Sequence, residues 1–219
     1  MVAYVWQSVI KMAETEFDMK FKSLRDIHKE GTLRDSPLEF IRQAAQDEEI
    51  NNPQKLLQGA GRTRRLLPGR MYMMRYKPQN MNTLPYWDMF PVFFCIHAGK
   101  NYFTGLNLHY LEPILRAELM NAFYPFVVAP NAQGEQMQQT LRTRLMERVQ
   151  YSFMKRRRSM RSFKPCWKKY RYENVQGSYL YVPPVAWDAV MMMPLQRFRK
   201  AGINRVWRDS RKIRLGQKP

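Results

Sequence analysis

The sequence predicts an α+β fold, in which a small, bent antiparallel sheet or SH3-like barrel is surrounded by helices and preceded by an N-terminal amphipathic helix. The sheet is predicted from four short aromatic and apolar runs, because such runs between Pro, Gly and Asn residues are typical of strands: 70–76, 91–98, 102–111 and 178–183. The helices are predicted from apolar residues that recur at steps of three and four. The 219 residues can bury a core without disulfides or metals.

Two parts of the chain are expected. Residues 1–60 form an N-terminal helical segment, and residues 61–219 form an α+β domain whose last third is strongly basic. Within the first part, residues 4–28 repeat apolar positions at helical spacing. This helix either packs on its own domain or docks on a partner, and the sequence leaves both alternatives open.

A second helix is expected over 36–50. Ser36 is a good N-cap, Pro37 suits the first helical position, and Glu39 completes a capping box. Residues 56–69 have the composition of a linker and carry three arginines. Because no strand precedes their G-A-G and no G-K-S/T follows it, this is not a phosphate-binding loop.

The middle of the chain changes to strand-like patterning. The residues 98–101 read as the hairpin turn between the runs 91–98 and 102–111. The segment 77–91 contains three prolines, which is too many for a central strand. The remaining chain is expected to be mostly helical, with helices over 113–124, 135–154, 187–194 and 195–202, the last two divided by Pro194 and the last ended by Gly202.

The charge is unevenly distributed along the chain. Residues 1–140 hold 16 Lys and Arg against 14 Asp and Glu, whereas residues 141–219 hold 21 against 4. Nearly all of the net charge of +19 therefore lies in the last third. This asymmetry indicates a polyanionic partner, with DNA or RNA ahead of an acidic protein surface or anionic lipid.

The most basic stretch, 153–172, holds nine Lys and Arg and no acidic residue, and aromatic residues are interleaved with them. Arginine pairs bidentately with phosphate, and aromatic side chains can stack on bases. Helical spacing after Pro165 would give Trp167 and Tyr170 one aromatic face beside a basic one. The alternative is that these aromatic residues anchor the segment in the core while the charges face outward.

A second basic group, 197–214, contains a single acidic residue, Asp209, and is expected to extend the same surface. The predicted DNA-binding residues are drawn from both groups: Lys155, Arg156, Arg157, Arg158, Arg161, Lys164, Trp167, Lys168, Lys169, Arg171, Arg197, Arg199, Lys200, Arg208, Arg211 and Lys212.

Signals for an enzyme are weak, and neither a catalytic residue, a metal nor a cofactor is predicted. His97 and His109 could meet in a metal site completed by Asp88 or Glu112, but histidines in an aromatic sheet are more often structural. Cys95 and Cys166 share no close motif, which favours two unpaired thiols in a reducing compartment. No run approaches the ~20 apolar residues of a membrane span, and no secretory signal is recognised, so no membrane contact is expected.

Three long blocks carry a family resemblance. They are PGRMYMMRYKPQNMNTLPYWDMFPVFF, GLNLHYLEPILRAELMNAFY, and the segment from FKPCWKKY to VWRDSRK, which together span roughly 70–212. They resemble the DNA end protector family of T-even-like tailed phages and their cyanophage relatives. The matching positions are Pro85, Tyr86, Asp88, Pro91, Gly105, Asn107, His109, Tyr110, Arg116, Pro165, Cys166, Trp187, Pro194 and Ser210. Most of them read as fold determinants.

The resemblance implies a non-enzymatic virion protein that binds the ends of packaged DNA and shields them from the host recombination exonuclease after injection. Its partners would be the DNA phosphate backbone, including ends, and other virion proteins such as neck or portal components. It would be found in the virion, and in the host cytoplasm during assembly and after injection. The alternative is a structural component of the phage neck, head-completion complex or baseplate.

Overall fold

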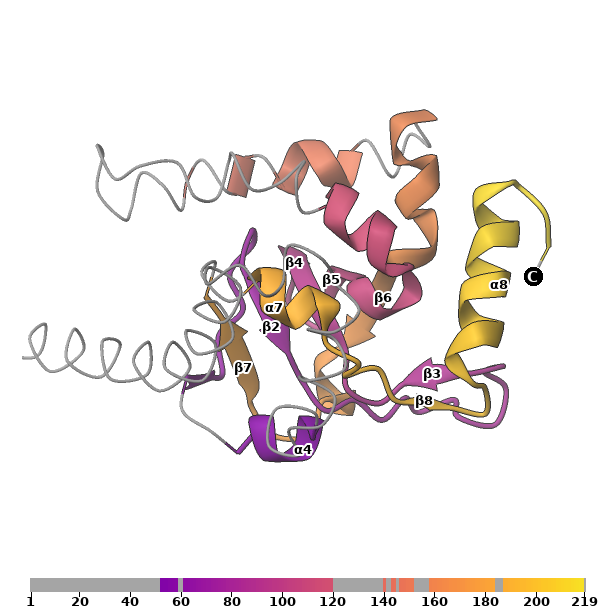
Figure 1. The fold of residues 1–219 in the computed structure, drawn as a ribbon. Coiled ribbons are helices and arrows are strands. Elements are labelled where there is room, and N and C mark those ends of the chain that lie inside the picture. The colour runs from indigo at the N-terminus through magenta and orange to yellow at the C-terminus, as the bar shows by residue number, and fades with distance from the viewer. Residues whose placement is uncertain are drawn as a thin grey trace, which may run out of the picture.

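The computed structural model describes residues 52–58, 61–119, 140, 143–144, 146–151, 158–183 and 187–218. These residues form a six-stranded antiparallel sheet, a two-stranded ribbon, and helices that lie against the sheet (Figure 1). The α+β class is thereby confirmed. The helices predicted at 4–28 and 36–50 lie outside the described residues.

The large sheet joins strands that are far apart in the sequence, in the order β1-β7-β2-β4-β5-β6. Each pair of neighbours is antiparallel. The strands are β1 (Arg62–Thr63), β2 (Met71–Met73), β4 (Val92–Ala98), β5 (Tyr102–Asn107), β6 (Trp167–Arg171) and β7 (Tyr179–Val182). The four predicted strands are present, although the third ends at Asn107 and a 3-10 turn, η1 (Leu108–Tyr110), follows it.

One face of the sheet is covered by helices. These are the helical residues 113–119 and 146–151 and α7 (Trp187–Met192), and α8 (Ile203–Arg214) adds Val206 to the same core from beside the sheet. Trp187 of α7 is fully buried, and its ring meets that of Phe94 edge-on, with 4.7 Å between the centroids. Its Nε1–H donates to the Val182 carbonyl at 3.0 Å, which fixes α7 against β7. The short helix α4 (Pro53–Leu56) also packs on this core through Leu56.

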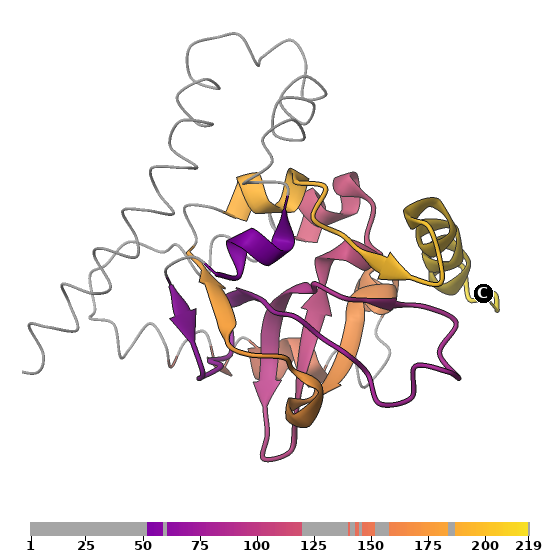
Figure 2. The same cartoon turned by 90° about the horizontal axis from the view of Figure 1, so that it is seen from below.

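The other face is lined by aromatic rings. Phe103 stacks on Phe93 and on Tyr170, with ring centroids 5.3 and 5.2 Å apart. Phe103 also meets Tyr179 at 5.8 Å, although three strand positions separate β5 from β7 in the sheet order. A contact across that distance requires a strongly bent sheet, so the bend that the sequence predicted is confirmed (Figure 2).

The SH3-like barrel is not confirmed, because the described sheet is open. β1 and β6 lie at opposite edges, and no pairing joins them. The aromatic side chains fill the bend, and β1 contributes only two residues to its edge.

The basic stretch does not continue as a helix beyond Pro165. A 3-10 helix, η2 (Arg158–Cys166), leads directly into strand β6. Residues three apart lie on opposite faces of a strand. Trp167 therefore packs against the helix-covered core, whereas Tyr170 joins the aromatic face. The shared aromatic face predicted for these two residues is wrong.

The helix predicted over 195–202 is also wrong. Phe198–Arg199 form a strand, β8, that pairs with β3 (Trp87–Asp88) in the two-stranded ribbon. Gly202 does not end a helix but starts one, since it is the N-cap residue of α8. The ribbon carries α8 to one side of the sheet, where it stands beside β3 and β8 (Figure 1).

Lys200 holds the turn between β8 and α8. Its φ of 66° lies in the left-handed region, which side chains other than glycine adopt rarely. Its ammonium group donates to the carbonyls of Met81, Asn82 and Leu84, at 2.6, 3.2 and 3.3 Å. The side chain thus fastens the proline-rich loop to the ribbon, which explains how the strained backbone is maintained.

Both cysteines are free, as the sequence predicts, and both are buried. Burial raises the pKa of Cys95 to about 12 and raises that of Cys166 further. The Cys166 thiol donates to the Phe163 carbonyl at 2.9 Å. In the described part of the chain, no helix is both long enough and apolar enough to cross a bilayer.

We expect Gly105→Ala to destabilise the sheet. A Cβ at residue 105 would lie 2.6 Å from Cδ2 of Phe93 and 3.0 Å from the Phe94 carbonyl, and both phenylalanines are fully buried. Such overpacking costs about 1–3 kcal/mol, measurable as a lower urea midpoint. Gly202→Ala is the matched control, because no atom lies within 4 Å of the added Cβ. Equal midpoints for wild type and Gly105→Ala would contradict the packing described.

Candidate nucleic-acid interface

Helix α8 has one buried face and one basic face. Val206, Asp209 and Ser210 are buried against the body of the protein. Arg205, Arg208 and Arg211 recur every three residues and are exposed, so they lie along the outer side of the helix. Three basic residues also occupy the last turn, where positive charge offsets the negative end of the helix dipole.

Polar contacts fix the orientation of this helix. The Trp207 Nε1–H donates to the His109 carbonyl at 3.1 Å, and the Arg211 Nε lies 2.6 Å from the Glu112 carboxylate. On the same side of α8, the hydroxyl of Tyr86 is hydrogen-bonded to Asp209; burial and this carboxylate raise the pKa of Tyr86 to about 12. Because the stretch 109–112 and Tyr86 both hold α8, its basic face has a defined direction.

The two basic groups of the sequence meet in space. η2 packs against α8, although about 40 residues separate them in the chain. Lys164, near the end of η2, is exposed, and β6 adds exposed Lys169 and Arg171 at the edge of the sheet. The term basic surface is used below for the exposed basic residues of η2, β6 and α8. The common surface expected from the two groups is consistent with this packing.

The predicted DNA-binding residues fall into three sets. Lys155, Arg156 and Arg157 lie outside the described residues, and of Arg158 and Arg161 only the backbone, within η2, is described. A second set is exposed: Lys164, Lys169, Arg171, Arg199, Lys200, Arg208 and Arg211. The third set is partly buried: Trp167, Lys168, Arg197 and Lys212. DNA contact at each of these residues stays a prediction.

Lys168 turns its charge into the protein. The residue retains some exposure, but its ammonium group is enclosed and lies 3.6 Å from the centroid of the Tyr110 ring. Burial lowers the pKa of Lys168 to about 8, and the nearby Cys166 and Asp88 only partly oppose that shift. This cation is therefore poorly placed to reach a phosphate.

Other predicted cations also have partners within the chain. Arg197 donates to the Pro194 and Gln196 carbonyls at 2.7 and 3.1 Å, and Lys200 holds the three carbonyls described above. Arg171 pairs with Glu173 at 3.0 Å, but both side chains are more than half exposed. The pair is therefore weak, and Arg171 can leave Glu173 to contact a phosphate. The predicted stacking residue Trp167 packs on the core, and Trp207 anchors α8.

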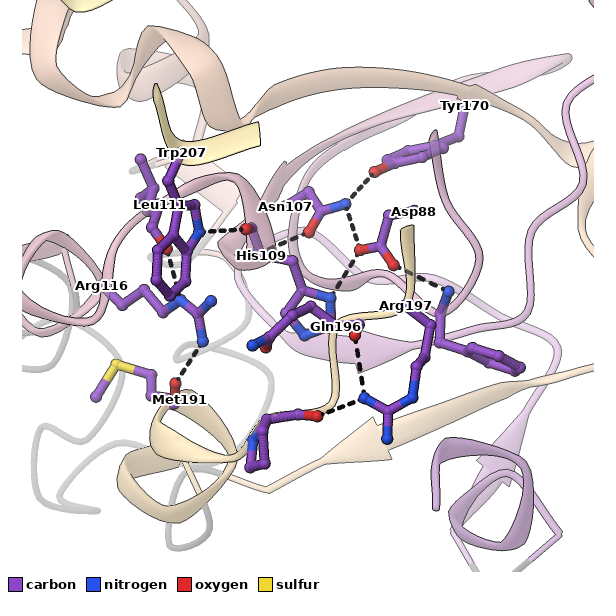
Figure 3. A network of polar contacts seen from close by, with 12 residues as sticks. Asp88, Asn107, His109, Leu111, Arg116, Tyr170, Met191, Gln196, Arg197 and Trp207 are labelled. Carbon is purple, nitrogen blue, oxygen red and sulfur yellow. Dashed lines mark hydrogen bonds and ion pairs between the residues drawn. The ribbon is translucent and has the colours of Figure 1, made fainter. Parts of the chain in front are cut away.

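A buried polar network lies beneath the basic surface and centres on Asp88 (Figure 3). Its Oδ2 accepts from Asn107 Nδ2 at 3.1 Å and from His109 Nδ1 at 2.7 Å, while its Oδ1 accepts from the Phe90 N–H at 3.1 Å. Asn107 donates as well to the Tyr170 hydroxyl at 3.0 Å, which links the network to β6. All of these side chains are buried.

Arg116 borders this network and carries a buried charge. Its Nε donates to the Leu111 carbonyl and its Nη1 to the Met191 carbonyl, both at 2.8 Å, which ties the helical residues 113–119 to α7. Its guanidinium lies 5.8 Å from the Trp207 ring centroid. Burial lowers the pKa of Arg116 to about 10, so it remains a cation at neutral pH.

The surroundings of the His109–Asp88 pair indicate a structural role. Burial lowers the pKa of His109, and the charges of Arg116 and Arg197 add to that effect against the opposing influence of Asp88. The ring is therefore neutral at pH 7 and donates from Nδ1. Because His109 is fully buried, this pair cannot reach a substrate. Among the described residues, no three His, Cys, Asp or Glu side chains meet in a metal-binding group, so His97 does not join the pair.

Sequence reasoning missed Arg205, which is exposed on the basic face of α8. The spacing Arg205, Arg208, Arg211 could have revealed the face, had 203–214 been recognised as a helix. It was not, because Gly202 was interpreted as a stop. Eleven of the fourteen positions that carry the family resemblance are buried: Asp88, Pro91, Gly105, Asn107, His109, Tyr110, Arg116, Pro165, Cys166, Trp187 and Ser210. Their interpretation as fold determinants is consistent with the structure.

An open bent sheet that supports an outward-facing basic helix, with little opposing charge, is typical of proteins that bind polyanions. Residues 43–210 match the family described as the phage T4 terminal DNA protecting protein, and the chain belongs to this family. The match covers most of the chain and starts within the N-terminal segment, upstream of the blocks that carry the resemblance. No curated protein and no solved structure matches the chain.

We expect the free energy of unfolding to fall below pH 6.5, the ordinary pKa of histidine. There the unfolded chain takes up a proton that the buried His109 ring, whose pKa is lowered, does not accept. The loss is at most about 1.4 kcal/mol per pH unit for this residue. His109→Asn keeps a donor near the position of Nδ1 but cannot titrate, so its stability should depend less on pH.

Urea unfolding at several pH values measures this difference in slope, whatever the absolute stability of the variant. His97→Asn is the control, since His97 lies at the partly exposed end of β4. Parallel pH profiles for wild type and His109→Asn would show that His109 is not the residue responsible.

Proposed function

We propose that this protein binds the ends of phage DNA through its basic surface and protects them by occlusion, without catalysing a reaction. The family supports the role in end protection. The single observation that carries the proposed contact is the basic face of α8, where Arg205, Arg208 and Arg211 are all exposed and Arg211 also pairs with Glu112 at its edge. Phosphate contacts hold the duplex, and the bulk of the protein blocks the entry of an exonuclease.

The proposed binding is independent of sequence. Phosphates are the same at each base pair, so contacts from arginine and lysine carry no direct sequence information. A protein that caps genome ends must accept whatever sequence lies there. The protein would travel with the DNA in the virion and enter the host cytoplasm with it, in contact with neck or portal proteins.

The clearest test compares the protection of linear and circular DNA. An exonuclease that starts at ends should degrade naked linear DNA and spare linear DNA to which the protein is bound. An endonuclease should cut linear and circular complexes equally, which controls for general coating. If linear DNA is not protected while the protein is present in purified particles, the assembly role in the neck or baseplate is favoured instead.

We expect binding to duplex DNA to weaken steeply with salt. If about six phosphates are neutralised, the slope of log affinity against log salt should be roughly −5, because each contact releases condensed counterions. Fluorescence anisotropy on a labelled duplex between low and physiological salt measures this slope. A flat dependence would overturn the proposed phosphate contact.

The same titration separates exposed from enclosed cations. Arg208→Ala should reduce the magnitude of the salt slope by about 1, because its guanidinium is exposed on α8. Lys168→Met removes one charge as well but should leave the slope unchanged, because that ammonium group is enclosed over Tyr110. Equal effects of the two substitutions would mean that net charge, not the described surface, determines binding.

A further inference from the structure

Two aliphatic side chains are conspicuously exposed. Ile114, at the start of the helical residues 113–119, is 76% exposed, and Leu215, at the end of α8, is 72% exposed. The remaining large apolar residues of these two elements are buried or partly buried, including Leu115, Leu119 and Val206. Neither exposed side chain contributes to the core.

The two residues lie on elements that contact each other. The Arg211–Glu112 ion pair, at 2.6 Å, joins the elements that carry them. Leu215 follows Arg211 by one helical turn, and Ile114 follows Glu112 by two residues. α8 also packs against η1, which precedes Glu112. We infer from these contacts that Ile114 and Leu215 lie near each other beside the basic face of α8, and we name the two residues the aliphatic corner.

Leu215 is held in place by the end of its helix. The N–H of Gly216 donates to the Ile213 carbonyl at 3.1 Å, and that of Gln217 donates to the Lys212 carbonyl at 2.9 Å. Gly216 adopts a left-handed φ of 80°, which turns the chain away directly after Leu215. This is the Schellman arrangement that closes helices. Leu215 therefore presents an aliphatic side chain from an ordered position, so binding would cost little conformational entropy.

Basic residues surround this end of α8. Arg208 is exposed, Lys212 and Arg214 are partly exposed, and Lys218 is exposed beyond the turn. Glu112 is engaged by Arg211, and exposed Glu118, one turn beyond Ile114, marks the limit of the basic rim on that side. The corner is thus an aliphatic centre with a rim that is positive along α8.

A duplex end has the complementary pattern. The last base pair exposes one flat face, whereas interior base pairs stack on both sides, and phosphates run along the rim of that face. Leucine and isoleucine are among the side chains that proteins place against base faces. An aliphatic centre gains nothing from the sugar–phosphate side of a continuous duplex, where it would meet charged oxygens. Such a corner therefore distinguishes an end from the interior.

We propose that Ile114 and Leu215 pack on the face of the terminal base pair of duplex DNA, while the basic residues of α8 hold the phosphates beside it. This inference rests on the proposed function and adds the element that recognises the end. The rival is Tyr102, 38% exposed at the β4–β5 hairpin, but the Lys169 ammonium already lies 3.7 Å from its ring centroid and His97 flanks it at 6.2 Å.

The test uses the full chain and two DNAs of the same sequence, a blunt linear duplex and a dumbbell whose ends are closed by hairpin loops. Wild type should bind the linear duplex more tightly. The double substitution Ile114→Ser and Leu215→Ser should reduce this preference by about tenfold, the loss expected when aliphatic burial is removed. Affinity for the dumbbell should stay within about twofold, because the basic residues are retained.

Tyr102→Ser is the matched control and should leave the preference unchanged. Circular dichroism and the thermal midpoint check that both variants fold. If wild type prefers linear DNA and the double variant retains that preference, this inference fails while end protection stands. The same holds if Tyr102→Ser alone abolishes the preference. If wild type shows no preference for open ends, both the proposed function and this inference are overturned.

Discussion

The buried carboxylate of Asp88 is the contact on which the arrangement of the interface depends. It accepts hydrogen bonds from Asn107 at the end of β5, from His109 in η1, and from the backbone of Phe90. Asp88 also belongs to β3, the strand that pairs with β8 and so leads to α8. A single side chain thus joins the large sheet to the ribbon. An ion in this position is stable only because each of its oxygens has a donor.

The consequences spread outward from this carboxylate (Figure 3). Asn107 also donates a hydrogen bond to Tyr170 of β6, and the His109 carbonyl accepts one from Trp207 of α8. Strand β6 and helix α8, which carry the accessible charge, are therefore positioned by the hydrogen bonds of two uncharged residues, Asn107 and His109, to the Asp88 carboxylate. Lys168 and Arg116 bring positive charge close to it, so the interior beneath the basic surface is itself electrostatically asymmetric.

The class of fold could be predicted from sequence because strands β2, β4, β5 and β7 are apolar and bounded by turn residues. Strand β6 could not, because its sequence WKKYR has a charged majority and its only fully buried side chain is Tyr170. Its strand conformation comes from pairing with β5, a tertiary effect that local patterning does not report. The openness of the sheet likewise depends on how aromatic rings fill the bend, which requires their three-dimensional contacts.

The candidate site was predictable in its charge and not in its geometry. Composition placed the positive charge in the last third, where the described structure has its basic surface. It could not show that Lys168 turns inward or that Lys200 binds three carbonyls, since both look like any other lysine in a basic run. Helix α8 was not predicted, because Gly202 is expected to end a helix when only the sequence is considered. Glycine is common both just before and just after helices, and only the contacts of the neighbouring residues show which of the two applies.

The two buried thiols have a consequence of a different kind. The reactive species of cysteine is the thiolate, and burial raises the pKa of both Cys95 and Cys166 far above neutrality. Neither sulfur is then available for oxidation, for exchange with small thiols, or for cross-linking to another copy. As far as its two cysteines are concerned, the folded chain is insensitive to the redox potential around it, and it would keep one covalent state in oxidising and reducing surroundings alike.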